Sequence, residues 1–506
     1  MAVFQFILNH PFLQRTHHEK QPQSHSTATR RQQHTKDQRR RKRAKQKLKR
    51  QITEQQRADT ALAYEMRTTI EHHFPDLFDQ LRGMGEVRDE SKASDYELAA
   101  HLTACLALFL LKLGSRNQWN QKRKKLQFIR NYKKLFGFDM PHGDSMHAVI
   151  GALDEDQVEQ LKQQLVRSLL ERKVFRGQRF AGRWYPIAID ASGVVSFAHK
   201  HCEQCLHKTS KKGKVTYSHQ VLEARLVTPN GFSISLATEW VENPEGSEYD
   251  KQDCERKAFQ RLAKHLKESF PRLSILILAD GLYPYEGFFA TCREYGWEWS
   301  TTFKEGNLSS LWEEIHALQP LQPANTLSET RYEPGAVGLT QVLQSYCWVT
   351  GLDYQGHSLN WMSCEERITR QLRQDDGTRT EKTELVRFVH ITSLPVDATQ
   401  AALISRTARL RWKIENEGFN TLKNGGYGME HKWARKSYRA MKNYYQFMQI
   451  AHLIHQLMLK WQRFVNRYLK EMNHPTVKSL WEDLLGAMQW SKVKGKQLRR
   501  WLETPV

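Results

Sequence analysis

The sequence predicts an α/β protein in which a mixed sheet is flanked by helices, interrupted by a β-rich insertion and preceded by a helical region. Three observations predict this. Residues 61–180 carry apolar patterns with the period of a helix. Residues 181–315 combine buried strand-like runs with amphipathic helical patterns, which is typical of a mixed α/β sheet. Residues 316–400 then show interrupted strand patterns, and helical patterns return at about residue 401.

The charge of the chain favours an acidic partner. The 506 residues carry a formal net charge of +22, and Arg30–Arg50 supply +11 of it through twelve Lys or Arg and one Asp. The other half of the excess is spread over the rest of the chain, and nucleic acid is the commonest partner for such a surface. We expect residues 1–60 to be a basic flexible arm, with a solvated tail as the alternative, and residues 61–180 to be a helical DNA-binding region.

The cysteines and the apolar segments of the chain indicate the cellular compartment in which the protein works. Seven cysteines, mostly scattered, suggest a reducing cytosol rather than a disulfide scaffold. The opening "MAVFQFILNHPF" has no charged region before its short apolar run, so we expect no signal peptide. The run "HLTACLALFLLKLG" is too short to span a bilayer and predicts a buried helix. We therefore expect a cytoplasmic, nucleoid-associated protein that has no membrane partner.

Two apolar runs of the predicted sheet each end in an aspartate. "WYPIAIDASGVV" contains Asp190, and "LSILILADGLYP" contains Asp280. A Gly follows each Asp closely, which would let the backbone turn away and leave the carboxylate exposed. Because ligand sites in α/β sheets gather at strand ends, we expect these two side chains to lie together. The alternative is a turn or capping role for each aspartate. Between the two runs, "VTPNGF" predicts a β-hairpin.

A third acid lies in "RLRWKIENEGFNTLKNGGYGMEH", from Arg409 to His431. At 100° per residue, Trp412, Phe419 and Leu422 fall within about 60° of Glu415, whereas Glu417 points about 200° away. Glu415 is therefore expected on the packed face, and Glu417, the competing third acid, toward solvent. A buried carboxylate must be paired or bound to metal. The alternative role for Glu415 is an ion pair with Arg411 at i−4.

Asp190, Asp280 and Glu415 together would suit divalent metal. Three clustered acids repel one another unless cations neutralise them, and two Mg²⁺ (or Mn²⁺) ions can drive phosphoryl transfer. We expect the core to run over 181–315 and 401–470, the latter with the third carboxylate and a long helix near 435–469. Residues 471–506 are expected to form a helical tail.

Together, these segments resemble the DDE transposases of bacterial insertion sequences. The resemblance covers about residues 180–470 and lies in the branch that has a β-rich insertion before the third acid, which sits in a Tyr-Arg-Glu-Lys signature. It implies an RNase H-like core, with Asp190, Asp280 and Glu415 as the metal-binding triad and Arg411 contacting phosphate near the cut. Two positions depart from the signature: its Tyr is Ala408, and its Lys falls at Leu422, one residue before Lys423. Lys423 would still be near enough to contact DNA.

The implied activity is that of a DNA transposase. Such an enzyme binds double-stranded DNA at terminal inverted repeats, cleaves a strand with bound metal, and joins the free 3′-OH to target DNA, here expected as a homodimer. Two alternatives stay open. One is a metal-dependent nuclease with the same triad, and the other is a non-catalytic, domesticated DNA-binding protein.

Two secondary signals accompany the acids. Cys202-x-x-Cys205 has four histidines nearby and predicts half of a zinc site, with an incidental Lys/His-rich loop as the alternative; the histidines are His199, His201, His207 and His219. Trp297 and Trp299 follow the second Asp strand. They would either pack in the core or, for Trp299, bind DNA by stacking on an unpaired base.

Overall fold

The computed structural model describes residues 42, 44–47, 60–88, 95–243, 253–375, 377–466 and 476–503. The chain forms two compact units, Met1–Ala58 and Asp59–Val506. In the first unit the five described residues are helical, so the predicted basic arm lies almost wholly outside the described residues.

Helices fill the segment before the sheet. Residues 60–73 form a helix, and the elements after it are α2 (Leu77–Arg82), α3 (Leu98–Leu110), α4 (Arg116–Arg123), α5 (Leu126–Phe136), α6 (Gly143–Ala152), α7 (Glu155–Glu171) and η1 (Arg176–Gln178). α3 is buried along its whole length because nearly all of its residues are apolar. No helix within the described ranges is both long and apolar enough to cross a membrane.

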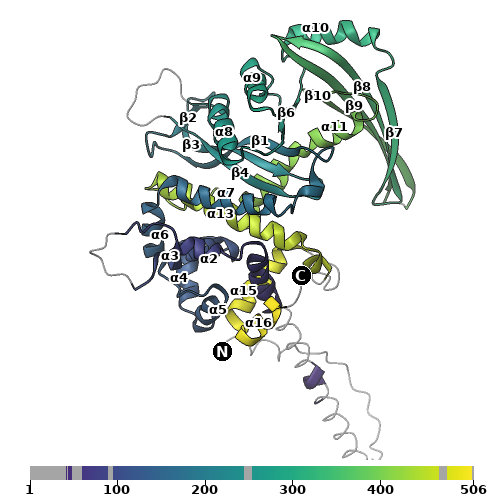
Figure 1. Ribbon diagram of the computed structural model, residues 1–506. Coiled ribbons are helices and arrows are strands. Elements are labelled where there is room, and N and C mark those ends of the chain that lie inside the picture. Colours follow the sequence, from purple (N-terminus) through teal and green to yellow (C-terminus); the bar gives the residue numbers. More distant parts are fainter. Residues whose placement is uncertain are drawn as a thin grey trace, which may run out of the picture. The chain divides into compact units, whose positions relative to one another are not determined.

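The predicted mixed α/β sheet is confirmed (Figure 1). Its first six strands are β1 (Tyr185–Phe197), β2 (Leu206–Thr209), β3 (Val215–Val227), β4 (Ser233–Val241), β5 (Ile275–Ala279) and β6 (Glu298–Thr302). β1 pairs antiparallel with β3, and β3 with β2 and β4, whereas β1, β5 and β6 are parallel neighbours. The crossovers to β5 and β6 are helices α8 (Glu255–Ser269) and α9 (Glu286–Tyr295). α8 packs on β3 and β4.

The predicted hairpin joins β3 to β4. Gly231 of the Pro-Asn-Gly turn has φ +86°, a conformation that glycine adopts without the strain of a side chain. Thr228 closes the turn: its amide donates to the carbonyl of Phe232, and its hydroxyl accepts from the Phe232 amide.

The β-rich segment extends the same sheet. After α10 (Ser309–Leu318) and η2 (Gln319–Leu321) come β7 (Thr326–Pro334), β8 (Leu339–Tyr354), β9 (His357–Arg373) and β10 (Arg379–Thr392), all antiparallel to their neighbours. β10 pairs with β6, so the strand order from one edge is β2-β3-β1-β5-β6-β10-β9-β8-β7, with β4 also on β3. In Figure 1 these long green strands extend away from α7 and α13, which pack on β4.

Helices return after β10 and close the core. They are α11 (Ala401–Ala408), η3 (Arg409–Arg411), η4 (Ile414–Phe419), α12 (Asn420–Asn424), α13 (Tyr438–Lys460), α14 (Gln462–Phe464), α15 (Val477–Trp490) and α16 (Gly495–Glu503). α13 is shorter than the helix expected over 435–469, because Trp461 is extended, with ψ 125°. It is buried along most of its length and packs on α3, α6, α7 and β4. α13 thereby joins the helical segment to the sheet.

Candidate active site

Asp190 and Asp280 occupy matching positions on adjacent parallel strands. β1 and β5 are paired at Ala188 and Leu278, and each aspartate lies two residues further along. β5 ends at Ala279, so the two carboxylates stand where this pairing stops. The Asp280 carboxylate accepts a hydrogen bond of 2.8 Å from the amide of Leu282, which fixes the turn after β5.

The prediction that the first strand ends at Asp190 is wrong. β1 continues through Asp190 to Phe197, with a register shift between Gly193 and Val195. It continues because β3 still pairs with it beyond the end of β5: Asp190 itself is opposite Glu223. Gly193 therefore lies within a strand and makes no turn.

Glu415 joins the two aspartates from a separate element. It lies in η4, a π-helical turn that packs on β1, and such turns occur frequently at functional sites. The pKa of Asp190 is raised, first by burial and then by the negative charges of Asp280 and Glu415, which oppose a lowering by Arg411. Asp280 and Glu415 are thus both near enough for their charges to act on Asp190.

Glu417 faces another way, but it does not point freely into solvent as expected. Its Oε1 accepts a hydrogen bond of 2.8 Å from Lys413, and its Oε2 is buried without a partner in the described part of the chain. Trp412, expected on the packed face, is 56% exposed. Both expectations were wrong because η3 and η4 are 3₁₀ and π turns, so a constant 100° per residue does not apply.

Arg411 provides the positive charge among these acids. Its guanidinium donates to Asp190 Oδ2 at 3.0 Å, and its side chain is 13% exposed. Nε of Arg411 is buried and has no hydrogen-bond partner among the described residues. A planar guanidinium presents its N–H donors in a fixed fork that suits carboxylate and phosphate oxygens.

A fourth acid, Glu255, was missed by the sequence reasoning. It is the first residue of α8 and accepts a hydrogen bond of 2.8 Å from the Tyr283 hydroxyl. Its pKa is raised to about 7, first by burial and then by Asp190 and Asp280, against the opposing effect of the Tyr283 hydrogen bond and Arg411. An acid in the first turn of a helix is common, so the sequence held no signal that separates Glu255 from a stabilising first-turn charge.

The carboxylates do not reach the spacing of a single ion's ligands. Of the described residues, only Cys202, Cys205 and His219 form a group of three whose ligand atoms all lie within 4.8 Å of one another. The three carboxylates are therefore not closed up as the ligands of one ion, and the two-metal arrangement expected for Asp190, Asp280 and Glu415 stays a prediction. Like charges repel, and Arg411 occupies one oxygen of Asp190. The donor set still fits hard cations, because these cations prefer carboxylate oxygens, and the charges of Asp280 and Glu415 both act on Asp190.

Two residues expected to bind DNA are engaged elsewhere. Trp299 on β6 is 4% exposed, and its ring stacks on Phe289 at 4.7 Å between centroids. The proposal that it stacks on a base is corrected, because neither face of a buried indole is open to DNA. Lys423 lies 3.6 Å from Glu430, and in the described ranges no hydrogen bond or ion pair joins it to the triad.

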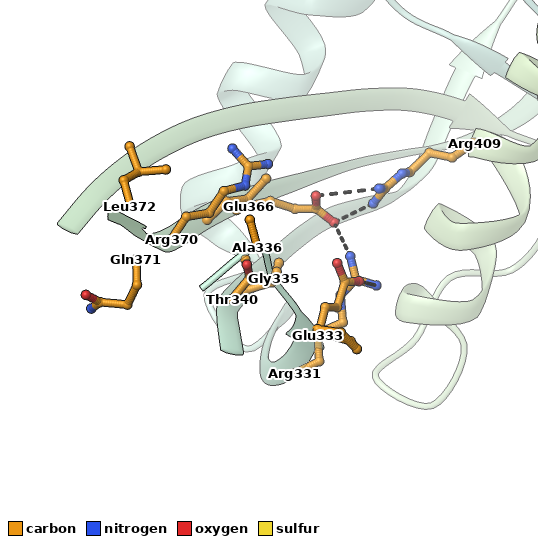
Figure 2. A pocket seen from close by; sticks show the side chains of 13 residues that line it. Arg331, Glu333, Gly335, Ala336, Thr340, Glu366, Arg370, Gln371, Leu372 and Arg409 are labelled. Atoms are coloured by element: carbon orange, nitrogen blue, oxygen red, sulfur yellow. Dashed lines mark hydrogen bonds and ion pairs between the residues drawn. The ribbon is translucent and has the colours of Figure 1, made fainter. Parts of the chain in front are cut away.

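An arginine-lined hollow lies between η3 and the β-rich segment. Figure 2 shows Arg331 from β7 and Arg409 from η3 both pointing at Glu366 of β9. This hollow has a volume of about 660 Å³. A neighbouring hollow of about 400 Å³ has both arginines in its wall and is lined by Arg331, Phe388, Arg406, Arg409, Leu410 and Trp412. We call the residues of this second hollow the arginine surface, and η3 connects it to Arg411.

The predicted half zinc site gains one histidine. Sγ of Cys202 and Sγ of Cys205 are 3.5 Å apart, and each is 3.4 Å from Nε2 of His219. Burial lowers the pKa of His219 to about 4, so its imidazole is neutral at physiological pH. Among the described residues, His199, His201 and His207 do not join this group.

No known protein family model matches the chain, and no curated protein resembles it closely enough to indicate a relationship.

Proposed function

We propose that this chain is a DNA transposase that uses bound metal to cleave a strand at insertion-sequence ends and to join the 3′-OH to target DNA. The observation that carries the proposal is the meeting of Asp190 and Asp280, from matching positions of two parallel strands, with Glu415. Three acids from distant parts of the sequence have no structural need to meet, since their repulsion destabilises the fold unless a cation compensates it.

The sheet order supports an RNase H-like core. The strands β4-β3-β1-β5-β6 lie side by side, the first three antiparallel and the last three parallel, as that fold requires. Strands β7 to β10 lie in sequence between β6 and η4, which supports the proposal that they are the β-rich insertion implied by the family resemblance.

Asp190, Asp280 and Glu415 would hold two Mg²⁺ or Mn²⁺ ions. When bound, such ions activate the attacking oxygen and stabilise the leaving oxygen of the phosphodiester. Arg411 now holds Asp190 Oδ2, and if it released that oxygen for metal binding, its guanidinium would have donors for a DNA phosphate. Glu255 adds negative charge behind Asp190 and Asp280 and strengthens cation binding once it is ionised.

The DNA would bind through positive charge and one exposed aromatic ring. The net charge is +22, and the arginine surface places Arg406 and Arg409 beside the exposed ring of Trp412. Guanidinium groups bind phosphates, and an exposed indole can stack on an unpaired base. We propose terminal inverted repeats and target DNA as partners, a homodimer as the active form on DNA, and a location at the nucleoid.

Two alternatives predict different products from one assay. A metal-dependent nuclease would use the same acids to cut without joining, and a domesticated protein would bind without cutting. The assay incubates the chain with Mg²⁺, a labelled duplex taken from the DNA that flanks its reading frame, and a target plasmid.

A transposase yields labelled strands joined to the plasmid, and these products require Mg²⁺. Cleavage without joined products would favour the nuclease, and binding without any strand break would favour the domesticated protein. An unrelated duplex of equal length is the control, because a transposase should join the flanking sequence in preference to it.

A further inference from the structure

We propose that Cys202, Cys205 and His219 bind one structural Zn²⁺ ion, with His201 as the fourth ligand. The site lies outside the carboxylate cluster and is independent of the activity proposed above. Thiolate and imidazole groups are the ligands that zinc prefers, and Cys-x-x-Cys is a common spacing of such ligands.

The spacing of the three ligand atoms is that of a tetrahedral zinc site. Bonds of about 2.3 Å to sulfur and about 2.0 Å to nitrogen put tetrahedral ligands about 3.8 Å apart for two sulfurs and about 3.6 Å for sulfur and nitrogen. The three separations here are 3.5, 3.4 and 3.4 Å. A disulfide does not explain the approach, because its sulfurs would be about 2.05 Å apart.

The backbone around the cysteines is fixed in place. The Cys205 amide lies 3.5 Å from the Cys202 carbonyl, so the chain folds back between the two sulfurs. The Asn243 side chain donates to the Cys205 carbonyl at 3.0 Å, and the Asn243 amide donates to the Gln204 carbonyl at 3.3 Å. These bonds anchor the loop between β1 and β2 to the end of β4, and such support holds a ligand set ready for a metal.

Strand β3 and the ring of Tyr438 hold His219 in position. His219 is in β3, opposite Val195 of β1, and its ring stacks on Tyr438 at 4.3 Å. Its Nδ1 is buried without a hydrogen-bond partner in the described ranges, so ring stacking orients the imidazole and Nε2 faces the sulfurs. His219 and Cys205 are each 3% exposed, so the site is shielded from solvent on this side.

His201 is the residue that can complete the site. Structural zinc sites have four protein ligands, and His201 directly precedes Cys202. Its exposed ring packs on Phe197 at 3.9 Å, and the same Phe197 ring lies 6.2 Å from the ring of His219. Rotation of the exposed His201 side chain toward the two sulfurs would supply the fourth ligand. The ion would then clamp the β1–β2 loop to β3, at the opposite end of β1 from its pairing with β5.

The test is metal analysis of the full chain purified under reducing conditions without chelator. We expect about one zinc per chain, and about one Co²⁺ after exchange, with a thiolate-to-cobalt absorption band and the d–d bands of a tetrahedral site. Cys202→Ser and His219→Ala should abolish that band. Cys347→Ser, a cysteine of β8 outside the group, is the matched control and should leave metal content unchanged.

A chain that contains no zinc and takes up neither Zn²⁺ nor Co²⁺ overturns the proposal. If Cys202→Ser fails to fold, the cobalt spectrum of the wild-type chain still decides the matter, because its charge-transfer band requires thiolate ligands. His201→Ala should weaken zinc binding and change the d–d bands. An identical spectrum in that variant would remove His201 from the ligand set.

Discussion

At the residue scale, two tryptophans near the acids differ in what surrounds the indole. Trp299 is 4% exposed and contacts the rings of Phe288 and Phe289, whereas Trp412 is 56% exposed and lies beside the guanidinium of Arg411. A buried ring contributes to stability through packing, and an exposed ring beside arginines is available to a ligand. The two residues therefore allow stability and DNA binding to be separated.

Trp299→Ala should destabilise the chain by about 3–5 kcal/mol, the usual cost of removing a buried aromatic ring. Trp412→Ala should change the free energy of unfolding by less than about 0.5 kcal/mol. It should instead weaken binding to DNA with unpaired bases by about 1–3 kcal/mol, since base stacking is lost. Urea unfolding and fluorescence anisotropy measure the two effects. Unchanged DNA affinity in Trp412→Ala would contradict the role given to the arginine surface.

At the scale of elements, the turn after α12 depends on the end of α3. Gly426 and Gly428 have φ of +89° and +69°, so glycines are needed to bring the chain from α12 to α13. Lys112 donates to the Gly425 carbonyl at 2.7 Å, and its amine lies 4.7 Å from the centroids of the Tyr427 and Trp481 rings. Burial lowers the pKa of Lys112 to about 7.

This lysine predicts a pH dependence of stability. Between its folded pKa of about 7 and its ordinary value of 10.5, the unfolded chain binds more protons than the folded chain. The contribution of Lys112 to the free energy of unfolding therefore rises with pH above 7 and is constant below it. Lys112→Met should lack this rise, and Lys436→Met, at an exposed lysine, should keep it. Urea unfolding from pH 6 to 9 measures the profiles; parallel profiles for wild type and Lys112→Met would refute this account of the turn.

Local patterns explain which elements could be predicted. The Pro-Asn-Gly turn and the apolar runs of β1 and β5 have strong local signals, and these elements were predicted. β6 was missed because "WEWSTT" is short, and its burial comes from neighbours far away in sequence. The η3 and η4 turns depart from α-helical period, so the sequence placed Trp412 on the wrong face.

At the scale of the whole chain, the candidate site depends on long-range register. Asp190, Asp280 and Glu415 come from β1, β5 and η4, and β7 to β10 separate the last two in sequence. The sequence could identify these three acids, because two of them follow apolar strand patterns and the third falls on the packed face of a predicted helix. It could not supply Glu255, because only the crossover of α8 brings that residue beside Asp190 and Asp280. Nor could it show that Arg411 pairs with Asp190 rather than with Glu415 at i+4.

The central claim is that Glu415, and not its neighbour Glu417, acts with Asp190 and Asp280 in metal-dependent DNA cleavage. The most direct measurement compares the Mg²⁺-dependent cleavage rates of Glu415→Gln and Glu417→Gln on the same labelled duplex, with DNA affinity measured alongside. Glu415→Gln should be slower by about 10³-fold or more, because a lost ligand charge removes several kcal/mol of transition-state stabilisation. Its DNA affinity should be nearly unchanged, because lysines and arginines carry the binding. Glu417→Gln should cleave at close to the wild-type rate. Full cleavage by Glu415→Gln, or an equal loss in both variants, would contradict the account.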